Sequence, residues 1–78
     1  MSSRSSGNTR LYIGNVSRRT RQRDLEDPFR RFGRIRDVDL KTDYGFIEFY
    51  DARDAEDALR DMHRRTIDGS KIVVEWAG

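Results

Sequence analysis

The chain has 78 residues, of which 38% are charged and 35% hydrophobic, so it is long enough for one small domain with a modest core. It contains no Cys, which excludes a disulfide framework and a thiolate metal site, and no apolar run approaches membrane-spanning length. Residues 1–36 hold ten Arg against three acids (+7), whereas residues 37–78 hold six basic residues against eleven acids (−5). The basic first half favours a nucleic-acid surface, although a mixed solvated surface is the competing interpretation.

The chain begins with a short polar segment and a strand. Residues 1–9 are small and polar and are predicted to form a disordered tail, which carries one Ser-Arg-Ser triplet. Residues 10–16 are predicted to form a strand, in which side chains alternate between two faces. Leu11 and Ile13 are expected on the buried face, and Tyr12 on the other.

The first helix is predicted to begin near Thr20, a suitable N-cap, and to end at Gly33, a residue type common just after helices. Its buried stripe, spaced at i, i+4 and i+7, is formed by Leu25, Phe29 and Phe32. Pro28 lies inside this helix, where a proline removes one backbone donor and destabilises the helix by roughly 3 kcal/mol. We therefore expect a kink or an early end near Pro28.

Two strands are predicted next, joined by a very short link. The first covers residues 35–41 and points Val38 and Leu40 inward. Only Thr42-Asp43 separates it from a strand over residues 44–49. Because the link is so short, the two strands are expected to pair as a hairpin.

The second strand of this hairpin carries aromatic rings on both faces. Ile47 and Phe49 share one face and suit the buried side of a sheet. Tyr44 and Phe46 are then left on the opposite face, beside Glu48. Adjacent exposed rings in an Arg-rich chain suggest a platform on which nucleic-acid bases stack.

The second helix is predicted to begin after Asp51, an acceptable N-cap. Its apolar stripe is formed by Ala55, Ala58, Leu59 and Met62. Asp68-Gly69 is a turn signal, and a last strand is predicted over residues 71–76. Alternation in that strand points Trp76 toward the helices, where core packing is expected.

The order strand, helix, strand, strand, helix, strand predicts an α+β domain built from two split βαβ units. Right-handed crossovers place both helices on one face of a four-stranded antiparallel sheet, which is a ferredoxin-like βαββαβ sandwich. The first and third strands are expected side by side in the centre. Tyr12, Tyr44 and Phe46 would then meet on the open face of the sheet.

Two stretches resemble the paired motifs of a known family, the RNA recognition motif. Leu-Tyr-Ile-Gly-Asn-Val at residues 11–16 is similar to its shorter motif at every position. Residues 42–49 resemble its longer motif from the third position on, whereas Thr42 and Asp43 replace a basic residue and a Gly. The motifs lie about thirty residues apart with a helical pattern between them. The resemblance covers residues 10–77.

The resemblance implies which residues contact RNA. Tyr12 and Phe46 match the positions on which two neighbouring bases stack, and Tyr44 matches the one that packs against the sugars between them. The competing interpretation is that a terminal segment or a partner covers these rings. Glu75 is expected on the open face and is hypothesised to accept a hydrogen bond from an amino-bearing base, although a solvated acid explains it nearly as well. Asn15, the Asn of the shorter motif, is a further candidate contact.

Basic residues near the first strand are candidate phosphate contacts, which position an RNA without reading its sequence. The main candidates are Arg10, Arg18, Arg19 and Arg21, and the lesser ones are Arg36, Lys41 and Lys71. Each of them is also explained as a solvated charge. Thr42 cannot pair with phosphate and Asp43 adds negative charge, so we expect modest affinity.

Within the family, the chain resembles the first RNA recognition motif of SR splicing proteins and related mRNA-binding shuttling proteins. This resemblance is carried by residues 9–15, 23–26, 32–35, 39–41, 44–49, 51–58 and 72–75. It implies a single-stranded RNA-binding domain that serves pre-mRNA splicing or mRNA processing and export, in the nucleus and with shuttling to the cytoplasm. Such proteins carry an Arg-Ser- or Arg-Gly-rich tail, so this chain is expected to be one domain of a longer protein.

The expected partner is single-stranded pre-mRNA or mRNA, joined by splicing or export proteins that bind the helix face or regions outside this chain. We expect a monomer with no cofactor, no metal and no membrane contact.

One alternative is a protein–protein interaction module, although residues 66–69 do not match the Arg-x-Phe loop of family members that hold a Trp ligand. The other is an enzyme. His63 is the only His and is expected at a helix end, and no nucleophile or general base is visible, so no catalytic residue is predicted.

Overall fold

The computed structural model describes residues 8–77 and has two helices and six strands in that range. In chain order, the elements are β1 (Arg10–Gly14), α1 (Gln22–Arg30), β2 (Ile35–Leu40), β3 (Gly45–Phe49), α2 (Ala52–Met62), β4 (Thr66–Ile67), β5 (Ser70–Lys71) and β6 (Val73–Trp76). Neither of these two helices has the length and apolar character needed to cross a membrane. The predicted tail lies outside the described residues except for its last two, and the carbonyl of Thr9 accepts a hydrogen bond from the Phe49 amide at 2.8 Å.

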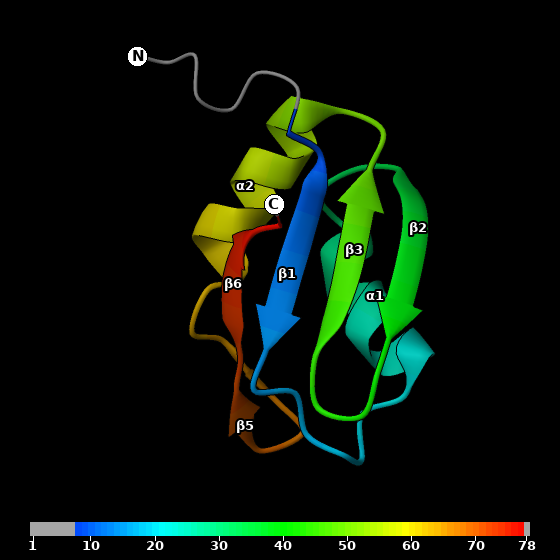
Figure 1. The fold of residues 1–78 in the computed structure, drawn as a ribbon. Coiled ribbons are helices and arrows are strands. Elements are labelled where there is room, and N and C mark those ends of the chain that lie inside the picture. The colour runs from blue at the N-terminus through cyan, green and yellow to red at the C-terminus, as the bar shows by residue number, and fades with distance from the viewer. Residues whose placement is uncertain (1–7, 78) are drawn as a thin grey trace.

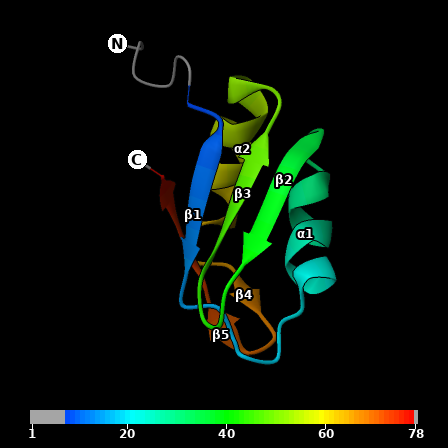
Figure 2. The same ribbon diagram turned by 45° about the vertical axis from the view of Figure 1, so that its right-hand side comes forward.

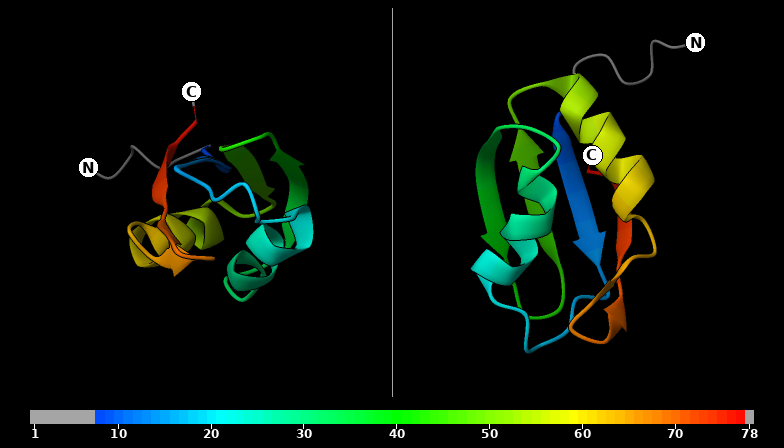
Figure 3. Two further views of the ribbon diagram at one scale, coloured as in Figure 1. Left: turned by 90° about the horizontal axis from the view of Figure 1, so that it is seen from below. Right: turned by 180° about the vertical axis from the view of Figure 1, so that it is seen from behind.

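The main sheet is antiparallel and has the strand order β2-β3-β1-β6, with β1 and β3 in the centre. Figure 1 shows this sheet in front of α1 and α2, and the views from below and from behind show both helices on the same side (Figure 3). This arrangement confirms the predicted ferredoxin-like sandwich. One face of the sheet is therefore covered by helices, and the other face is open.

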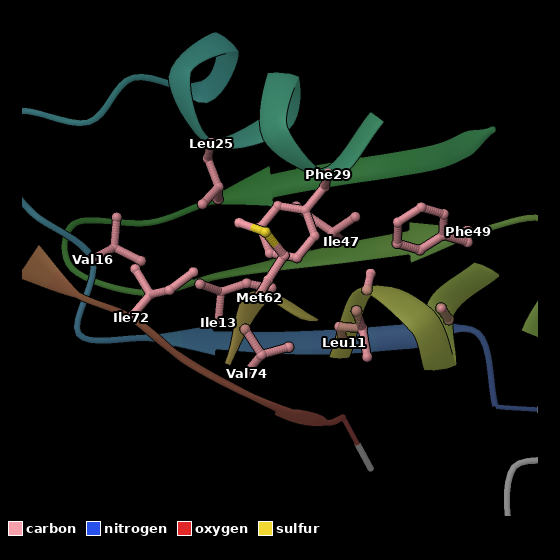
Figure 4. Packing of buried hydrophobic residues seen from close by; sticks show 12 residues of the cluster. Leu11, Ile13, Val16, Leu25, Phe29, Ile47, Phe49, Met62, Ile72 and Val74 are labelled. Carbon is pink, nitrogen blue, oxygen red and sulfur yellow. The ribbon is translucent and has the colours of Figure 1, made fainter. Parts of the chain in front are cut away.

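The core lies between the covered face and the two helices. Alternation along β1 and β3 places Leu11, Ile13, Ile47 and Phe49 there, and each is at most 1% exposed. The buried cluster consists of Leu11, Ile13, Val16, Leu25, Phe29, Ile47, Phe49, Ala55, Ala58, Met62, Ile72 and Val74 (Figure 4). Both helices contribute to it, so removal of their apolar stripes from water stabilises the whole sandwich.

The start of α1 differs from the prediction, because its N-cap is Arg21 and not Thr20. The Thr20 hydroxyl is buried and donates a hydrogen bond to Asp68 Oδ2 at 2.8 Å. It is therefore engaged by a distant residue instead of the helix end. The Asp24 carboxylate accepts a hydrogen bond from the Arg21 amide at 3.2 Å and satisfies that donor at the helix start.

The end of α1 lies before Gly33 and two residues after Pro28. The helix continues through Pro28 and ends at Arg30. Beyond it, the Phe32 amide donates to the Phe29 carbonyl at 3.1 Å, and the Gly33 amide donates to the Arg30 carbonyl at 3.3 Å, as in a tighter 3₁₀ turn. The helix thus ends earlier than Gly33 predicts, although it passes through Pro28 instead of breaking there.

The second half of the chain begins as predicted and ends differently. The Asp51 carboxylate caps α2 by accepting a hydrogen bond from the Arg53 amide at 2.9 Å. The strand predicted over residues 71–76 is divided: β5 pairs with β4 in a short hairpin (Figure 2), and β6 joins the main sheet. Asp68 and Gly69 form the turn of this hairpin, with φ values of 51° and 84° that match a type I′ turn.

Strand β2 contains a bulge that the sequence does not predict. Ile35 pairs with Phe49, and Asp37 pairs with Glu48, so Arg36 is an extra residue on β2. A bulge interrupts the alternation of side chains and can turn two neighbours toward the same side. Arg36 and Asp37 are both exposed accordingly.

Candidate nucleic-acid interface

Three aromatic rings meet near the centre of the open face. Tyr12 lies on β1, Phe46 lies on β3, and Tyr44 directly precedes β3. The ring centroids are 5.8 Å apart for Tyr12 and Phe46, 6.0 Å for Tyr12 and Tyr44, and 5.9 Å for Tyr44 and Phe46. Tyr44 is 37% exposed, and the other two rings are half-buried. The structure thus brings together the three rings predicted to meet, which we call the aromatic trio.

The register of the central strands and one glycine position the trio. Tyr12 lies directly opposite Phe46 in the β1–β3 pair, at a separation where side chains of neighbouring strands touch. Gly14 follows Tyr12 on the same face, and a Cβ atom at Gly14 would lie 2.9 Å from the Tyr12 hydroxyl oxygen. The Tyr12 ring therefore extends along β1 over a position where only a glycine leaves enough room.

The three ring planes do not form one flat surface. Tyr12 and Tyr44 are tilted by 33° to each other, whereas Phe46 makes angles of 61° with Tyr12 and 88° with Tyr44. Edge-to-face contacts of this kind are favourable between neighbouring rings. Bases stacked on Tyr12 and Phe46 in this arrangement would be inclined to each other.

Arg10 covers part of the trio. Its guanidinium carbon lies 4.8 Å from the centroid of the Phe46 ring, a cation–π geometry. Its Nη1 atom is 3.5 Å from Glu48 Oε1 and 3.9 Å from Asp37 Oδ2, and Glu48 also accepts a hydrogen bond from the Thr9 hydroxyl at 3.1 Å. Two carboxylates therefore balance the charge of Arg10. Its position favours stacking on a base over the predicted phosphate contact.

Glu75 lies directly opposite Tyr12 in the β1–β6 pair, and its side chain is exposed. Its neighbours Val74 and Trp76 pack against the core, so alternation places Glu75 on the open face as predicted. In the described part of the chain, the Glu75 carboxylate forms no ion pair. The carboxylate is available to accept a hydrogen bond beside the Tyr12 ring.

Three of the other cationic candidates differ in whether an acid lies beside them. The Nζ atom of Lys41 lies 3.5 Å from Asp39 Oδ1, so a neighbouring carboxylate partly neutralises it. Arg18 and Arg19 are exposed in the loop after β1, and neither forms an ion pair with any residue between 8 and 77. The two loop arginines are therefore better placed to meet a phosphate than Lys41 is.

Asn15 has a structural explanation. Its φ of 56° lies in the left-handed region, which Asn adopts more readily than most residues. Its Nδ2 atom donates a hydrogen bond to the Lys71 carbonyl at 2.8 Å. Asn15 thus ties the end of β1 to β5, and its contact with RNA stays a prediction.

At the edge of the sheet, a groove of about 510 Å³ lies where α2 meets β6. It is lined by Leu59, Arg60, His63, Val74, Glu75 and Trp76. His63 is the C-cap of α2, and its Nδ1 atom accepts a hydrogen bond from the Val74 amide at 3.1 Å, which confirms the expected helix-end role. Across residues 8–77, no group of three or more His, Cys, Asp or Glu side chains is placed to hold a metal ion.

The open face has one more aromatic residue, which the sequence does not single out. Tyr50 directly follows β3 and is 57% exposed. The guanidinium carbons of Arg34 and Arg36 lie 4.9 Å and 5.9 Å from its ring centroid. The sequence does contain a signal for this placement. Side chains alternate along a strand, and Tyr50 continues the every-second-residue series that contains Tyr44 and Phe46.

Known proteins match most of this chain. A family model of the RNA recognition motif matches residues 11–73. The chain is 61% identical over 69 residues to serine/arginine-rich splicing factor RS2Z32 of Arabidopsis thaliana, a match that covers 88% of this chain and 24% of that protein. It is 46% identical over 68 residues to serine/arginine-rich splicing factor 4 of Homo sapiens (87% and 14%) and 44% identical over 69 residues to serine-arginine protein 55 of Drosophila melanogaster (88% and 18%). The chain therefore spans less than a quarter of the length of each of these relatives.

Proposed function

The chain belongs to the RNA recognition motif family, and from this membership we propose that it binds single-stranded RNA on the open face of its sheet. Family membership also supports a binding domain and not an enzyme. The observation that carries the proposal is the aromatic trio, whose three rings lie within 6.0 Å of one another on a face that neither α1 nor α2 covers. Because its relatives are named as splicing factors, the proposed role is in pre-mRNA splicing in the nucleus.

Base stacking is the proposed source of most of the affinity. Tyr12 and Phe46 would each take one base, and Tyr44 would pack against the sugars between them. Such stacking contributes about 1–3 kcal/mol per base and tolerates any base, because every base has an aromatic face. Since Phe46 is inclined to Tyr12 by 61°, the RNA strand would turn between the two bases. A base on Phe46 would also meet Arg10, whose planar guanidinium can stack on it.

Weak base preference and modest affinity are proposed for two reasons. Glu75 is the one carboxylate placed opposite Tyr12, and it would favour cytosine or adenine there because their amino groups donate hydrogen bonds. Elsewhere on the open face, carboxylates compete with phosphate for the basic side chains, as Asp39 does for Lys41. Thr42 and Asp43 supply no cation beside the trio. We propose that about three to five nucleotides occupy the face.

The proposed partners beyond RNA are splicing or export proteins, bound through the helix side or through regions outside this chain. Shuttling to the cytoplasm and a monomeric state belong to the same proposal. A protein-binding domain is the second candidate function, and the groove between α2 and β6 is the observation that favours it. Leu59 and Trp76 give this groove an apolar lining on which a peptide side chain could pack.

Titration of the ¹⁵N-labelled chain with short C-, A-, G- and U-rich RNAs at fixed salt tests the two functions together. Amide shifts clustered at Tyr12, Tyr44, Phe46 and Glu75, and lost in the Phe46→Ala variant, are expected. Shifts that cluster instead around His63 and Leu59, or no shifts with any RNA, would contradict RNA binding by the open face. The four RNAs also rank the base preference, which is expected to favour the C- and A-rich strands.

A further inference from the structure

Tyr50 and two arginines form a cluster at the end of the open face where β3 ends. Because Phe49 is buried, alternation turns Tyr50 toward the open face. The Tyr50 amide donates a hydrogen bond to the Arg34 carbonyl at 3.1 Å, which extends the β2–β3 pairing and holds the two residues side by side. The bulge in β2 leaves Arg36 on the same side, within 5.9 Å of the Tyr50 ring centroid.

The geometry of this cluster keeps its hydrogen-bond donors free. The guanidinium carbons of Arg34 and Arg36 lie 4.9 Å and 5.9 Å from the Tyr50 ring centroid. The five N–H donors of a guanidinium lie in its own plane, so a guanidinium held over a ring still presents them at its edge. A phosphate group matches this fork of donors and can be bound by two of them at once. Because the ring restrains both arginines beforehand, less side-chain entropy is lost on binding.

In the described part of the chain, no acid lies close enough to Arg34 or Arg36 to form an ion pair. Glu48 and Asp37 are the carboxylates on the adjacent part of the open face, and both interact with Arg10, at 3.5 Å and 3.9 Å. Between residues 8 and 77, neither Arg34 nor Arg36 takes part in an ion pair. The cluster is thus a pair of positive charges beside an exposed ring, and an anion is the complementary ligand.

We propose that Arg34 and Arg36 bind a backbone phosphate of the RNA strand that lies on the aromatic trio, with Tyr50 as the ring that positions both arginines. We call these three residues the arginine clamp. Tyr50 directly follows β3 and lies four residues after Phe46, which is roughly 13 Å at the rise of a strand. The arginine clamp rests on the proposed function and lengthens the RNA footprint toward the start of β2. A phosphate contact adds affinity and orientation but no base preference.

Fluorescence anisotropy with labelled oligo(C), oligo(A), oligo(G) and oligo(U), measured on the whole chain over a series of salt concentrations, tests the arginine clamp. Arg34→Gln and Arg36→Gln are compared with Arg23→Gln, which removes the same charge from an exposed position on α1. Each clamp variant is expected to bind roughly three- to tenfold more weakly. The slope of log affinity against log salt should become shallower by about 0.7, while the order of the four RNAs stays the same. Arg23→Gln should match the unaltered chain.

Two substitutions of Tyr50 test the role of its ring. Tyr50→Phe keeps the ring and should bind like the unaltered chain, whereas Tyr50→Leu should lose part of the affinity. Equal losses in both would overturn the ring as the element that positions the arginines. If Arg34→Gln and Arg36→Gln behave like Arg23→Gln while Phe46→Ala abolishes binding, the arginine clamp is wrong and RNA binding by the trio stands. If the unaltered chain binds none of the four RNAs, the proposed function fails and the arginine clamp fails with it.

Discussion

The two faces of the central sheet use similar residues for opposite purposes. On β3, Ile47 and Phe49 point toward the helices and are at most 1% exposed, whereas Phe46 and the preceding Tyr44 point to the open side. Phe46 and Phe49 are the same residue type, three positions apart in one strand. Phe49 lies on the covered face and Phe46 on the open face. The face that a ring occupies therefore decides whether it stabilises the fold or remains available for a ligand. Because the period of a strand is two, stability and binding can be separated residue by residue.

Phe49→Ala tests the covered face and should have the largest effect. We expect the free energy of unfolding to fall by about 3–5 kcal/mol, because the substitution removes buried apolar area and leaves a cavity. Urea unfolding followed by the fluorescence of Trp76, the only Trp, measures this change. A loss below about 1 kcal/mol would contradict the placement of Phe49 in the core.

Phe46→Ala tests the open face and should weaken RNA binding more than it lowers stability. RNA binding should weaken by about 1–3 kcal/mol, because one stacking surface is lost, while stability changes little. The matched control is Ile47→Val at the next residue, which should lower stability by about 0.5–1.5 kcal/mol and leave RNA affinity unchanged. Titration and urea unfolding of both variants measure the two quantities. If Phe46→Ala unfolds the chain or Ile47→Val weakens binding, the two faces are not separable.

Gly14→Ala tests whether RNA binding depends on the position of the Tyr12 ring on the open face. The added Cβ would lie 2.9 Å from the Tyr12 hydroxyl oxygen, so the ring must tilt away and the trio is disturbed. We expect a loss of about 1 kcal/mol in RNA binding, less than a stacked base contributes. The control is Gly69→Ala, where no atom lies within 4 Å of the new Cβ but the φ of 84° is unfavourable for Ala. That variant should lose about 1 kcal/mol of stability and no RNA affinity.

Glu75→Gln should have the smallest effect, a change in preference without a change in fold. The preference for C-rich over U-rich RNA should shrink by roughly fivefold or less, because the amide cannot accept hydrogen bonds as a carboxylate does. Parallel titrations with the two RNAs measure the ratio of affinities. Glu56→Gln on α2 is the matched control and should leave the ratio unchanged. An unchanged ratio in Glu75→Gln would reduce Glu75 to a solvated acid.

Local signals predicted most of the fold and the trio. The N-cap at Asp51 and the turn at Asp68-Gly69 act within a few residues, so both could be recognised in the sequence. Alternation placed Tyr12 and Phe46 on the face opposite the core. The order of the elements then put β1 beside β3, which brings the rings into contact.

Thr20 and Asn15 show where such signals stop. Thr20 resembles an N-cap, but its hydroxyl bonds to Asp68, 48 residues further along the chain. Asn15 stays a predicted RNA contact, and the sequence does not show that its amide also donates a hydrogen bond to the Lys71 carbonyl, 56 residues away. A side chain of this kind has several possible partners, and the closest in sequence is not the one that packing brings near.

Short-range patterns of apolar and polar residues in the sequence were enough to predict the element order, the two faces of the sheet and the aromatic trio. The charge pattern of the open face depended on packing. Arg10 and Lys41 form ion pairs with carboxylates, whereas Arg34 and Arg36 lie beside Tyr50 without such partners in the described part of the chain. The physical reason is that ion pairing depends on distances between strands, and a single extra residue in β2 changes which side chains meet.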